Sequence, residues 1–434
     1  MYQVFSEQHR SIVSAILRSP VRPPKSMRGL DWRRFLQTYF ANVDSKDLAD
    51  RDPKDLAGAA LSHLMFAMRR RRTALVRVYN PTLREHGFVS PHTLIDVVND
   101  DMPFLVDSIS LALTERALTL HFLAHPIFAV TRDRAGTLSA LERRGEAKNS
   151  KQRLESFQHV EVDRIVDPAA LKALAAQIER SMRDVRVACA DWARMRNAVR
   201  SVAQELSSMS ARVDAAELSE TCALLEWMEN RHFTFLGYRE YRLQGREGRE
   251  KLEAIKATGL GILRPGHRRT ESTTRVLPSD IRRQSRSRSL SLVTKANSLS
   301  TVHRPGYLDY VGIKQFDAKG RLVGERRFLG LWTSAAYNSN PREIPVLRQK
   351  VAQVAEHFAL APDSHDVALM GGKTEQLAQE TLLHRRTLAQ CIHRRVDVLF
   401  NEIAELLRLA ANVIELFIKR IVADEDIGHE QAAS

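Results

Sequence analysis

The fold is decided by residues 93–117, TLIDVVNDDMPFLVDSISLALTERA, where a strand pattern gives way to a helix pattern. Residues 93–98 form a short apolar run that is typical of a strand. The next five residues, 99–103, indicate a loop whose acidic side chains would accept the first free amides of a helix and suit its positive end. A helix is expected from Phe104 to Ala117, because apolar residues recur near helical spacing.

The flanking segments extend this unit into a small α+β domain. Residues 75–79 alternate like a strand and end at Asn80-Pro81, which is a turn signal. Further strands are expected over residues 120–130 and 157–165. The order strand, strand, helix, strand, strand, followed by another helix, predicts helices packed on one face of a sheet.

Two helices and a second β region follow. Asp167-Pro168 opens a long amphipathic helix, with a capping Asp and Pro at the first helical position. A second helix starts at Asp214, and Glu217 three residues later completes a capping-box pattern. Strands are then expected between residues 232 and 333, and a helix over 345–358. A strong apolar stripe at helical spacing occupies residues 396–421.

These patterns divide the chain into five parts. An N-terminal helix and a Pro/Arg segment cover residues 1–31, and the first α+β domain covers residues 32–166. A helical hairpin, residues 167–230, separates it from a mixed β-rich domain, residues 231–366. A divergent helical tail is expected over residues 367–434.

Composition limits the classes of function. Lys and Arg outnumber Asp and Glu by 66 to 52, which gives a net charge of +14 and could attract nucleic acid. The basic runs 69–72 and 282–288 would serve such binding, but aromatic residues for base stacking are missing from the second run.

The three cysteines are too few and scattered for a disulfide framework or a zinc site. The first 30 residues do not resemble a secretory signal, and no apolar run is long enough to span a membrane, so a cytoplasmic protein is expected.

Two segments match part of a phosphate-binding or dinucleotide-binding motif, but each lacks a glycine that the motif requires. Gly372-Lys373-Thr374 ends like a phosphate-binding loop, but Val367 stands where the first glycine is required. Gly259-Leu260-Gly261 starts like a dinucleotide turn, but Arg264 stands at the third glycine position. We therefore expect no cofactor site and no catalytic residues within the chain.

Two further segments could bind a ligand. His121 and His125 have the spacing of a zinc-peptidase helix, but the general-base Glu is absent and the segment indicates a strand, which would hold the rings too far apart for one ion. We therefore expect no metal site there. Asn99, Asp100 and Asp101 could bind a metal or a polar effector, although capping a helix is the commoner role of such a loop. These three residues are the candidate regulatory ligand loop.

Several stretches, in order, resemble the large NAD-specific glutamate dehydrogenases of bacteria. The resemblance covers residues 32–366 and is carried by many separate segments: VVNDDMPFLVDS (97–108), HPIFAV (125–130), ESFQHV (155–160), HFTFLGYREY (232–241), TKANS (294–298), VHRP (302–305), GERRFLGL (324–331), YN (337–338) and PREIP (341–345).

This resemblance implies ACT-like (ferredoxin-like) regulatory modules placed ahead of a distant catalytic domain. It implies a cytoplasmic oligomer that converts glutamate and NAD to 2-oxoglutarate, ammonia and NADH, with its catalytic lysines and nucleotide-binding domain beyond residue 434. NAD is thus implied for the full-length enzyme, and none of its catalytic residues can be placed here. The likeness stops between residues 366 and 370, which suggests a truncated or frameshifted product, with a genuine short form as the rival.

Three functions are therefore open. The first is a regulatory or assembly portion of a glutamate dehydrogenase, which would associate with itself or with the rest of the enzyme. The second is a stand-alone module that senses a small metabolite. The third, and least favoured, is a basic nucleic-acid-binding protein.

Overall fold

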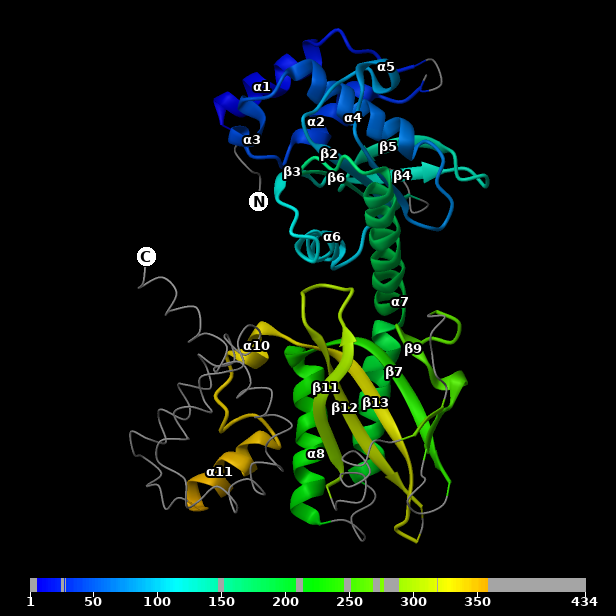
Figure 1. Cartoon of the computed structure of the whole chain (residues 1–434), viewed down its shortest axis with the longest axis vertical. Helices are drawn as coiled ribbons and strands as arrows, with labels where there is room; N and C mark the ends of the chain where they lie inside the picture. The colour runs from blue at the N-terminus through cyan, green and yellow to red at the C-terminus, as the bar shows by residue number, and fades with distance from the viewer. Residues whose placement is uncertain are drawn as a thin grey trace. The chain divides into compact units, whose positions relative to one another are not determined.

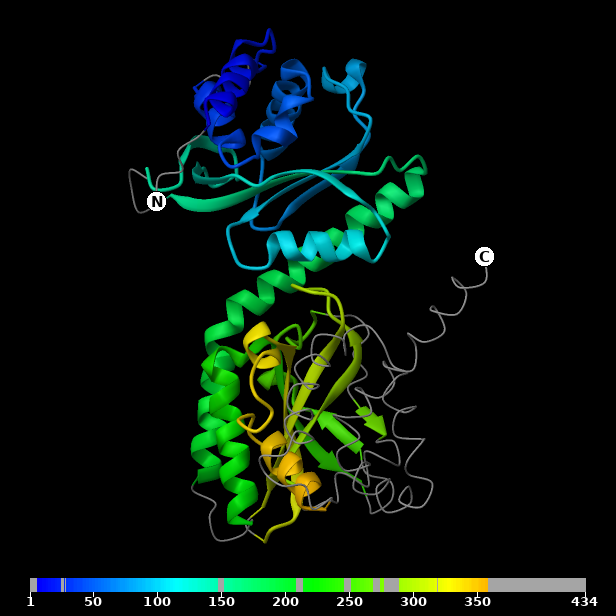
Figure 2. The same ribbon diagram turned by 90° about the vertical axis from the view of Figure 1, so that its left-hand side faces the viewer.

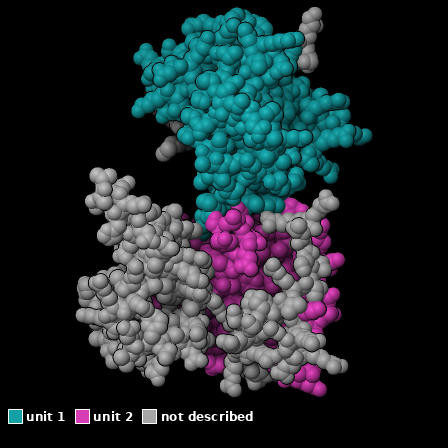
Figure 3. Space-filling view, viewed as in Figure 1, with its two compact units in different colours: residues 1–186, 301–305 teal, residues 187–300, 306–434 magenta. Residues whose placement is uncertain are grey.

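The computed structural model describes residues 6–24, 27, 29–146, 152–207, 214–245, 251–267, 274–276, 289–317 and 319–357. The chain divides into two compact units (Figure 3). Unit 1 comprises residues 1–186 and 301–305, and unit 2 comprises residues 187–300 and 306–434. The apolar stripe at 396–421, the Gly372-Lys373-Thr374 motif and Cys391 lie outside the described residues, as does the basic run at 282–288.

Unit 1 is built on a six-stranded antiparallel sheet (Figure 1). Its strand order is β1-β2-β6-β4-β5, and β3 pairs with β6 outside this path. The strands are β1 (Leu75–Tyr79), β2 (Thr93–Asp100), β3 (Leu120–Ala124), β4 (Ile127–Arg132), β5 (Leu138–Arg143) and β6 (Arg153–Val162). β6 is the last of them in the sequence, yet it pairs with β2, β3 and β4.

Helices cover both faces of this sheet (Figure 2). α6 and the first part of α7, which follow β2 and β6, lie on one face, and the five earlier helices lie on the other, so the helices do not pack on one face alone as expected. The helices of unit 1 are α1 (Glu7–Arg18), α2 (Trp32–Phe40), α3 (Ser45–Ala49), α4 (Pro53–Ala67), α5 (Leu83–His86) and α6 (Leu105–Thr114). Phe35 of α2 stacks on Phe128 of β4, with ring centroids 5.1 Å apart, and Phe157 of β6 packs edge-on against both rings.

One expected strand is interrupted. The single strand expected over residues 120–130 is two strands, because Pro126 between them has no backbone N–H to donate to the ladder. The carbonyl of Pro126 still accepts a hydrogen bond from the Phe157 amide at 3.0 Å. β3 and β4 therefore pair with successive parts of the same neighbouring strand, β6.

α7 (Pro168–Ser207) is a single helix of 40 residues, with its first part in unit 1 and the remainder in unit 2. Asp167 caps its start by accepting hydrogen bonds from the amides of Ala169 and Ala170. Apolar residues at helical spacing are buried along its length, from Leu174 and Ile178 to Val202 and Leu206. The expected long amphipathic helix is present.

Unit 2 is built on a seven-stranded antiparallel sheet with the order β10-β8-β7-β13-β12-β11, and β9 pairs with β7. The later part of α7 and helix α8 (Ala215–Trp227) pack on it, around a core that contains Met195, Leu225, Phe235 and Phe328. The strands are β7 (Phe233–Gln244), β8 (Lys251–Ala254), β9 (Leu260–Gly261), β10 (Thr274–Val276), β11 (Ser291–Leu299), β12 (Tyr307–Phe316) and β13 (Leu322–Trp332). Short helices α10 (Ser334–Tyr337) and α11 (Leu347–His357) follow.

The start of α8 differs in detail from its expected capping box. Asp214 caps the helix by accepting from the Ala216 amide, but Glu217 does not reach back to the cap. Its Oε1 instead accepts from the Leu290 amide at 2.9 Å and from the Ser289 hydroxyl at 3.0 Å. A tertiary contact with the segment before β11 therefore takes the place of the reciprocal cap.

Within the part of the chain that the structure describes, no helix combines the length and the apolar character that a membrane crossing requires.

Candidate functional site

Asn99 and Asp100 are strand residues, not the loop that the sequence indicates. They are the last two residues of β2 and pair with Ser156 and Glu155 of β6. The Asp101 amide continues this pattern by donating to the Leu154 carbonyl at 2.9 Å. α6 begins later, after Phe104, whose φ of 71° places it in the left-handed region and whose side chain cannot cap. The helix-capping role expected of the acidic residues is therefore wrong, because the β ladder holds this segment instead.

Arginines surround the end of β2. Arg70 Nη2 lies 2.8 Å from Asp100 Oδ1, and Arg186 Nη1 of α7 lies 2.6 Å from Asp100 Oδ2. Arg186 also donates to the side-chain oxygen of Asn99. Burial alone would raise the pKa of Asp100, but the charges and hydrogen bonds of Arg70 and Arg186 outweigh it and lower that pKa.

Glu155 completes this arginine network from the neighbouring strand. It is 1% exposed and accepts from Arg70 Nη1 at 2.6 Å and from Arg132 Nε at 2.8 Å. Arg132 Nη2 also donates to the second carboxylate oxygen at 2.7 Å. The buried guanidinium group of Arg70 and the partly buried one of Arg132 therefore share one buried carboxylate, which fixes the end of β2 against β6.

Two buried polar atoms beside this network lack a hydrogen-bond partner among the described residues. They are Asn99 Nδ2 and Gln158 Oε1, and both side chains are fully buried. Ser156 lies opposite Asn99 on β6, and its hydroxyl contacts Gln158 Nε2 at 2.5 Å and His125 Nε2 at 2.6 Å. An unmet buried donor and an unmet buried acceptor each cost about 1–3 kcal/mol. This group of side chains therefore retains one unmet donor and one unmet acceptor.

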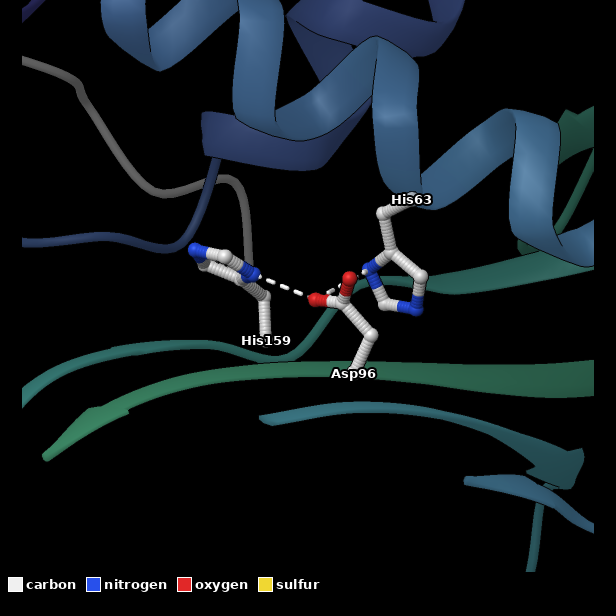
Figure 4. Close-up of side chains that lie close together, drawn as sticks. All are labelled: His63, Asp96 and His159. Atoms are coloured by element: carbon white, nitrogen blue, oxygen red, sulfur yellow. Dashed lines mark hydrogen bonds and ion pairs between the residues drawn. The ribbon is translucent and has the colours of Figure 1, made fainter. Parts of the chain in front are cut away.

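A second buried cluster lies beneath the N-terminal helices, on the face of the sheet opposite the side chains of Asn99 and Gln158. It consists of His63 from α4, Asp96 from β2 and His159 from β6 (Figure 4). Asp96 and His159 are direct cross-strand partners, so their side chains project from the same face of the sheet. All three residues are no more than 1% exposed.

Short contacts link this cluster. His159 Nδ1 lies 2.6 Å from Asp96 Oδ1, and His63 Nδ1 lies 3.8 Å from the same oxygen. The other carboxylate oxygen, Asp96 Oδ2, accepts from Arg77 Nη2 at 2.5 Å and from the Tyr79 hydroxyl at 3.1 Å. Asp96 is therefore the centre of the cluster, with each of its oxygens bound.

The two histidines have opposite electrostatic environments. Burial lowers the pKa of His63 to about 4, although Asp96 works in the other direction. Burial also disfavours charge on His159, but Asp96 and Glu161 outweigh it and raise the pKa of His159 to about 9. The pKa of Asp96 is lowered despite its burial, because both histidines and Arg77 stabilise the carboxylate. At neutral pH a neutral His63 and a protonated His159 therefore share one ionised Asp96.

Sequence reasoning did not identify this cluster, although one signal was available. Asp96 stands between apolar residues in the middle of β2, where a charged side chain must find a partner. His63 gives a weaker signal, since it lies within a run of buried residues on α4. Only the sheet register brings His159 opposite Asp96.

The remaining expected motifs occupy ordinary structural positions. His121 Nε2 bonds Asp163 at 2.7 Å and its ring stacks on His92, while His125 bonds Ser156, so the two histidines have separate partners. Of the basic run at 69–72, Arg70 is buried in the arginine network. The run therefore does not present four free cations.

The Gly259-Leu260-Gly261 turn is filled by protein atoms. The Gly261 amide donates to Asp191 Oδ2 of α7 at 2.8 Å, and Arg264 bonds the other oxygen of that carboxylate at 2.8 Å. The amide that a phosphate would need therefore already donates its hydrogen bond to a carboxylate, so this turn is not a phosphate-binding loop.

Comparison with known proteins identifies relatives of the chain. Residues 35–178 match the family model described as glutamate dehydrogenase, ACT1 domain. The chain is 34% identical over 393 residues to an NAD-specific glutamate dehydrogenase of Halomonas elongata, and 32% identical over 389 residues to one of Pseudomonas aeruginosa. Each match covers 89% of this chain and 23% of the relative. A Mycobacterium tuberculosis protein with the same description is 25% identical over 332 residues, or 76% of this chain and 19% of the relative.

The chain thus spans about a quarter of the length of the curated relatives it matches. The α+β architecture and the match to an ACT1 model agree with the ACT-like fold that the sequence suggested. Residues 35–178 match the model of the glutamate dehydrogenase ACT1 domain, and the chain is confirmed to resemble the N-terminal part of the large NAD-specific glutamate dehydrogenases.

Proposed function

We propose that this chain is the N-terminal regulatory and assembly portion of an NAD-specific glutamate dehydrogenase and does not itself transfer hydride. In the longer enzyme the reaction would convert glutamate and NAD to 2-oxoglutarate, ammonia and NADH. The observation that carries the proposal is the similarity of 89% of this chain to 23% of two such dehydrogenases. The match of residues 35–178 to a glutamate dehydrogenase ACT1 domain supports the regulatory part of the proposal.

The chemistry of the second unit supports the non-catalytic part of the proposal. Hydride transfer requires a cofactor held rigidly against the substrate. The glycine turn that comes closest to a dinucleotide motif has its amide bonded to Asp191, and that negative charge would repel a pyrophosphate.

We place the regulatory site at the end of β2, where the sequence suggested a ligand loop over Asn99, Asp100 and Asp101. The support is the unmet donor of Asn99 and the unmet acceptor of Gln158, together with the start of α6, which has no side-chain cap. A small metabolite with both donor and acceptor groups would satisfy these atoms. The same observation would equally serve a stand-alone metabolite-sensing module, which is the second candidate function.

The catalytic question is tested by assaying the purified chain for glutamate-dependent reduction of NAD. We expect no NADH above the background without glutamate. Sustained, glutamate-dependent turnover by the folded chain would overturn the proposal.

The regulatory question is tested by thermal unfolding with and without glutamate, 2-oxoglutarate and NAD. A ligand at 100 times its Kd stabilises the folded state by about 2.7 kcal/mol, which raises Tm measurably. Asn99→Ala should abolish the shift, whereas Gln177→Ala, which removes an exposed amide on α7, should retain it. A shift that survives in Asn99→Ala would place the effector elsewhere.

The same samples separate the remaining alternatives. Ligand-dependent stabilisation in a chain that never assembles with a dehydrogenase would favour the stand-alone sensor. Salt-sensitive binding to any DNA duplex would favour the basic nucleic-acid binder.

A further inference from the structure

The donor atoms of the buried histidine–aspartate cluster converge inside unit 1. One nitrogen of His63, one oxygen of Asp96 and one nitrogen of His159 all lie within 4.8 Å of one another. Bonds of about 2.0–2.2 Å from a zinc-type ion to imidazole and carboxylate would put such donor atoms roughly 3.3 Å apart. The distances from Asp96 Oδ1, 2.6 Å to His159 and 3.8 Å to His63, lie on either side of that value. Shifts of several tenths of an ångström would therefore admit an ion.

We propose that His63, Asp96 and His159 form a structural binding site for a divalent transition-metal ion of the zinc type. Two imidazoles and one carboxylate are a donor set that such ions prefer. The Tyr39 hydroxyl lies 2.8 Å from His63 Nδ1 and offers an oxygen beside the fourth position. Because all three ligands are buried, the ion would enter as the chain folds and stabilise unit 1.

The groups behind two of the three ligands, His159 and Asp96, are those expected around a bound metal, whereas the second ring nitrogen of His63, Nε2, is buried without a hydrogen-bond partner among the described residues. A metal-bound histidine usually directs its other ring nitrogen at a carboxylate, and a ligating carboxylate is itself hydrogen-bonded. His159 Nε2 lies 3.7 Å from Glu161 Oε1, and that carboxylate is held by Arg51 at 2.7 Å. The second oxygen of Asp96 is bound by Arg77 and Tyr79. The orientation of His159 and Asp96 is thus fixed from the far side.

The main effect that opposes metal binding is the positive charge that the ion would add to the cluster. Two carboxylates, Asp96 and Glu161, already face two guanidinium groups, Arg77 and Arg51. An added divalent ion is therefore poorly compensated unless it replaces a proton. The proton between His159 Nδ1 and Asp96 Oδ1 is the one that would leave, while the Nε2 proton would stay directed at Glu161. The rival state is a metal-free ion network held by that same proton.

The test is the metal content of the chain after its purification from cells grown with added zinc. The metal is quantified by inductively coupled plasma mass spectrometry. We expect one ion per chain in the wild type and none in His63→Gln. The matched control is His121→Gln, which removes a histidine of the same unit whose ring bonds Asp163 at the surface and should leave the ion in place. Metal well below one ion per chain in the wild type, or equal metal in His63→Gln and the wild type, would overturn the proposal.

A second measurement decides the matter if His63→Gln fails to fold. The wild-type chain is refolded with Co²⁺ and examined by optical absorption and proton NMR. Four-coordinate Co²⁺ with two paramagnetically shifted imidazole signals, absent when the chain is refolded without metal, supports the site. Refolding that yields the native structure without bound Co²⁺ assigns the cluster to the metal-free ion network and overturns it.

Discussion

Replacing Glu155 by Gln should destabilise unit 1 strongly, because the substitution removes the charge that the guanidinium groups of Arg70 and Arg132 share. Breaking a buried ion pair in this way typically costs about 3–5 kcal/mol. Gln has nearly the same shape as Glu, so packing is preserved. Its amide nitrogen must nevertheless replace one carboxylate oxygen and then faces a donor, since both oxygens accept from arginine.

The other contacts of Arg70 and Arg132 determine where the loss of stability falls within the range of about 3–5 kcal/mol. Arg70 is 3% exposed but keeps Asp100 at 2.8 Å, so part of its charge remains compensated. Arg132 also donates to the carbonyls of Ala67 and Gly136, which partly satisfy its donors. We therefore expect a loss near the lower end, about 3 kcal/mol.

Thermal unfolding measures this loss. For a folded unit of about 150–250 residues, 1 kcal/mol shifts Tm by about 2–4 °C, so Tm should fall by about 6–12 °C. Hydrogen exchange of the β6 peptide, residues 153–162, assigns the change to unit 1. The control is Glu179→Gln, whose partner Arg183 lies 3.9 Å away with both side chains about half exposed, and which should change stability by less than about 0.5 kcal/mol. A Glu155→Gln shift no larger than that of the control would refute the reasoning.

Two further predictions concern the loss of stability at low pH and the substitution of a glycine. The pKa of Asp100 is lower in the folded chain than its ordinary value of 3.8, so its contribution to stability is present above that value and lost as pH falls through the folded-state pKa; Asp100→Asn should flatten the acid side of the stability–pH curve, and an unchanged slope would contradict this. Gly261 has φ +59° and a Cβ there would clash with the Leu236 carbonyl oxygen, so Gly261→Ala should cost at least about 1–3 kcal/mol in chemical denaturation. Gly320→Ala, at φ +74° with open space around it, pays only the conformational part, and equal losses in the two variants would show that crowding is absent.

Local patterns in the sequence predicted elements whose signals are themselves local. β1 was expected over residues 75–79, where the structure has it, because alternation and the following Asn80-Pro81 turn both lie within a few residues. The start of α7 is likewise set by Asp167 and Pro168, which act on the first turn alone.

Features that depend on tertiary pairing were out of reach. The acidic residues after Val98 look like a helix cap, but pairing with β6 and the guanidinium groups of Arg70 and Arg186 keep Asn99 and Asp100 in the strand. The His63–Asp96–His159 cluster unites residues up to 96 positions apart, and it exists only because β2 and β6 pair in one register. Sequence alone contains no local signal for that register.

The place of β6 in the sheet has a consequence for how the chain folds. It is the last strand of unit 1 to be synthesised, yet β2, β3 and β4 all pair with it. β13 has the same relation to β7 and β12 in unit 2. Before residues 153–162 leave the ribosome, the earlier strands can form only the β1–β2 and β4–β5 pairs, which are marginal in isolation. Because contacts of long sequence separation slow folding, closure of each sheet by its last long strand should set the folding rate of that unit.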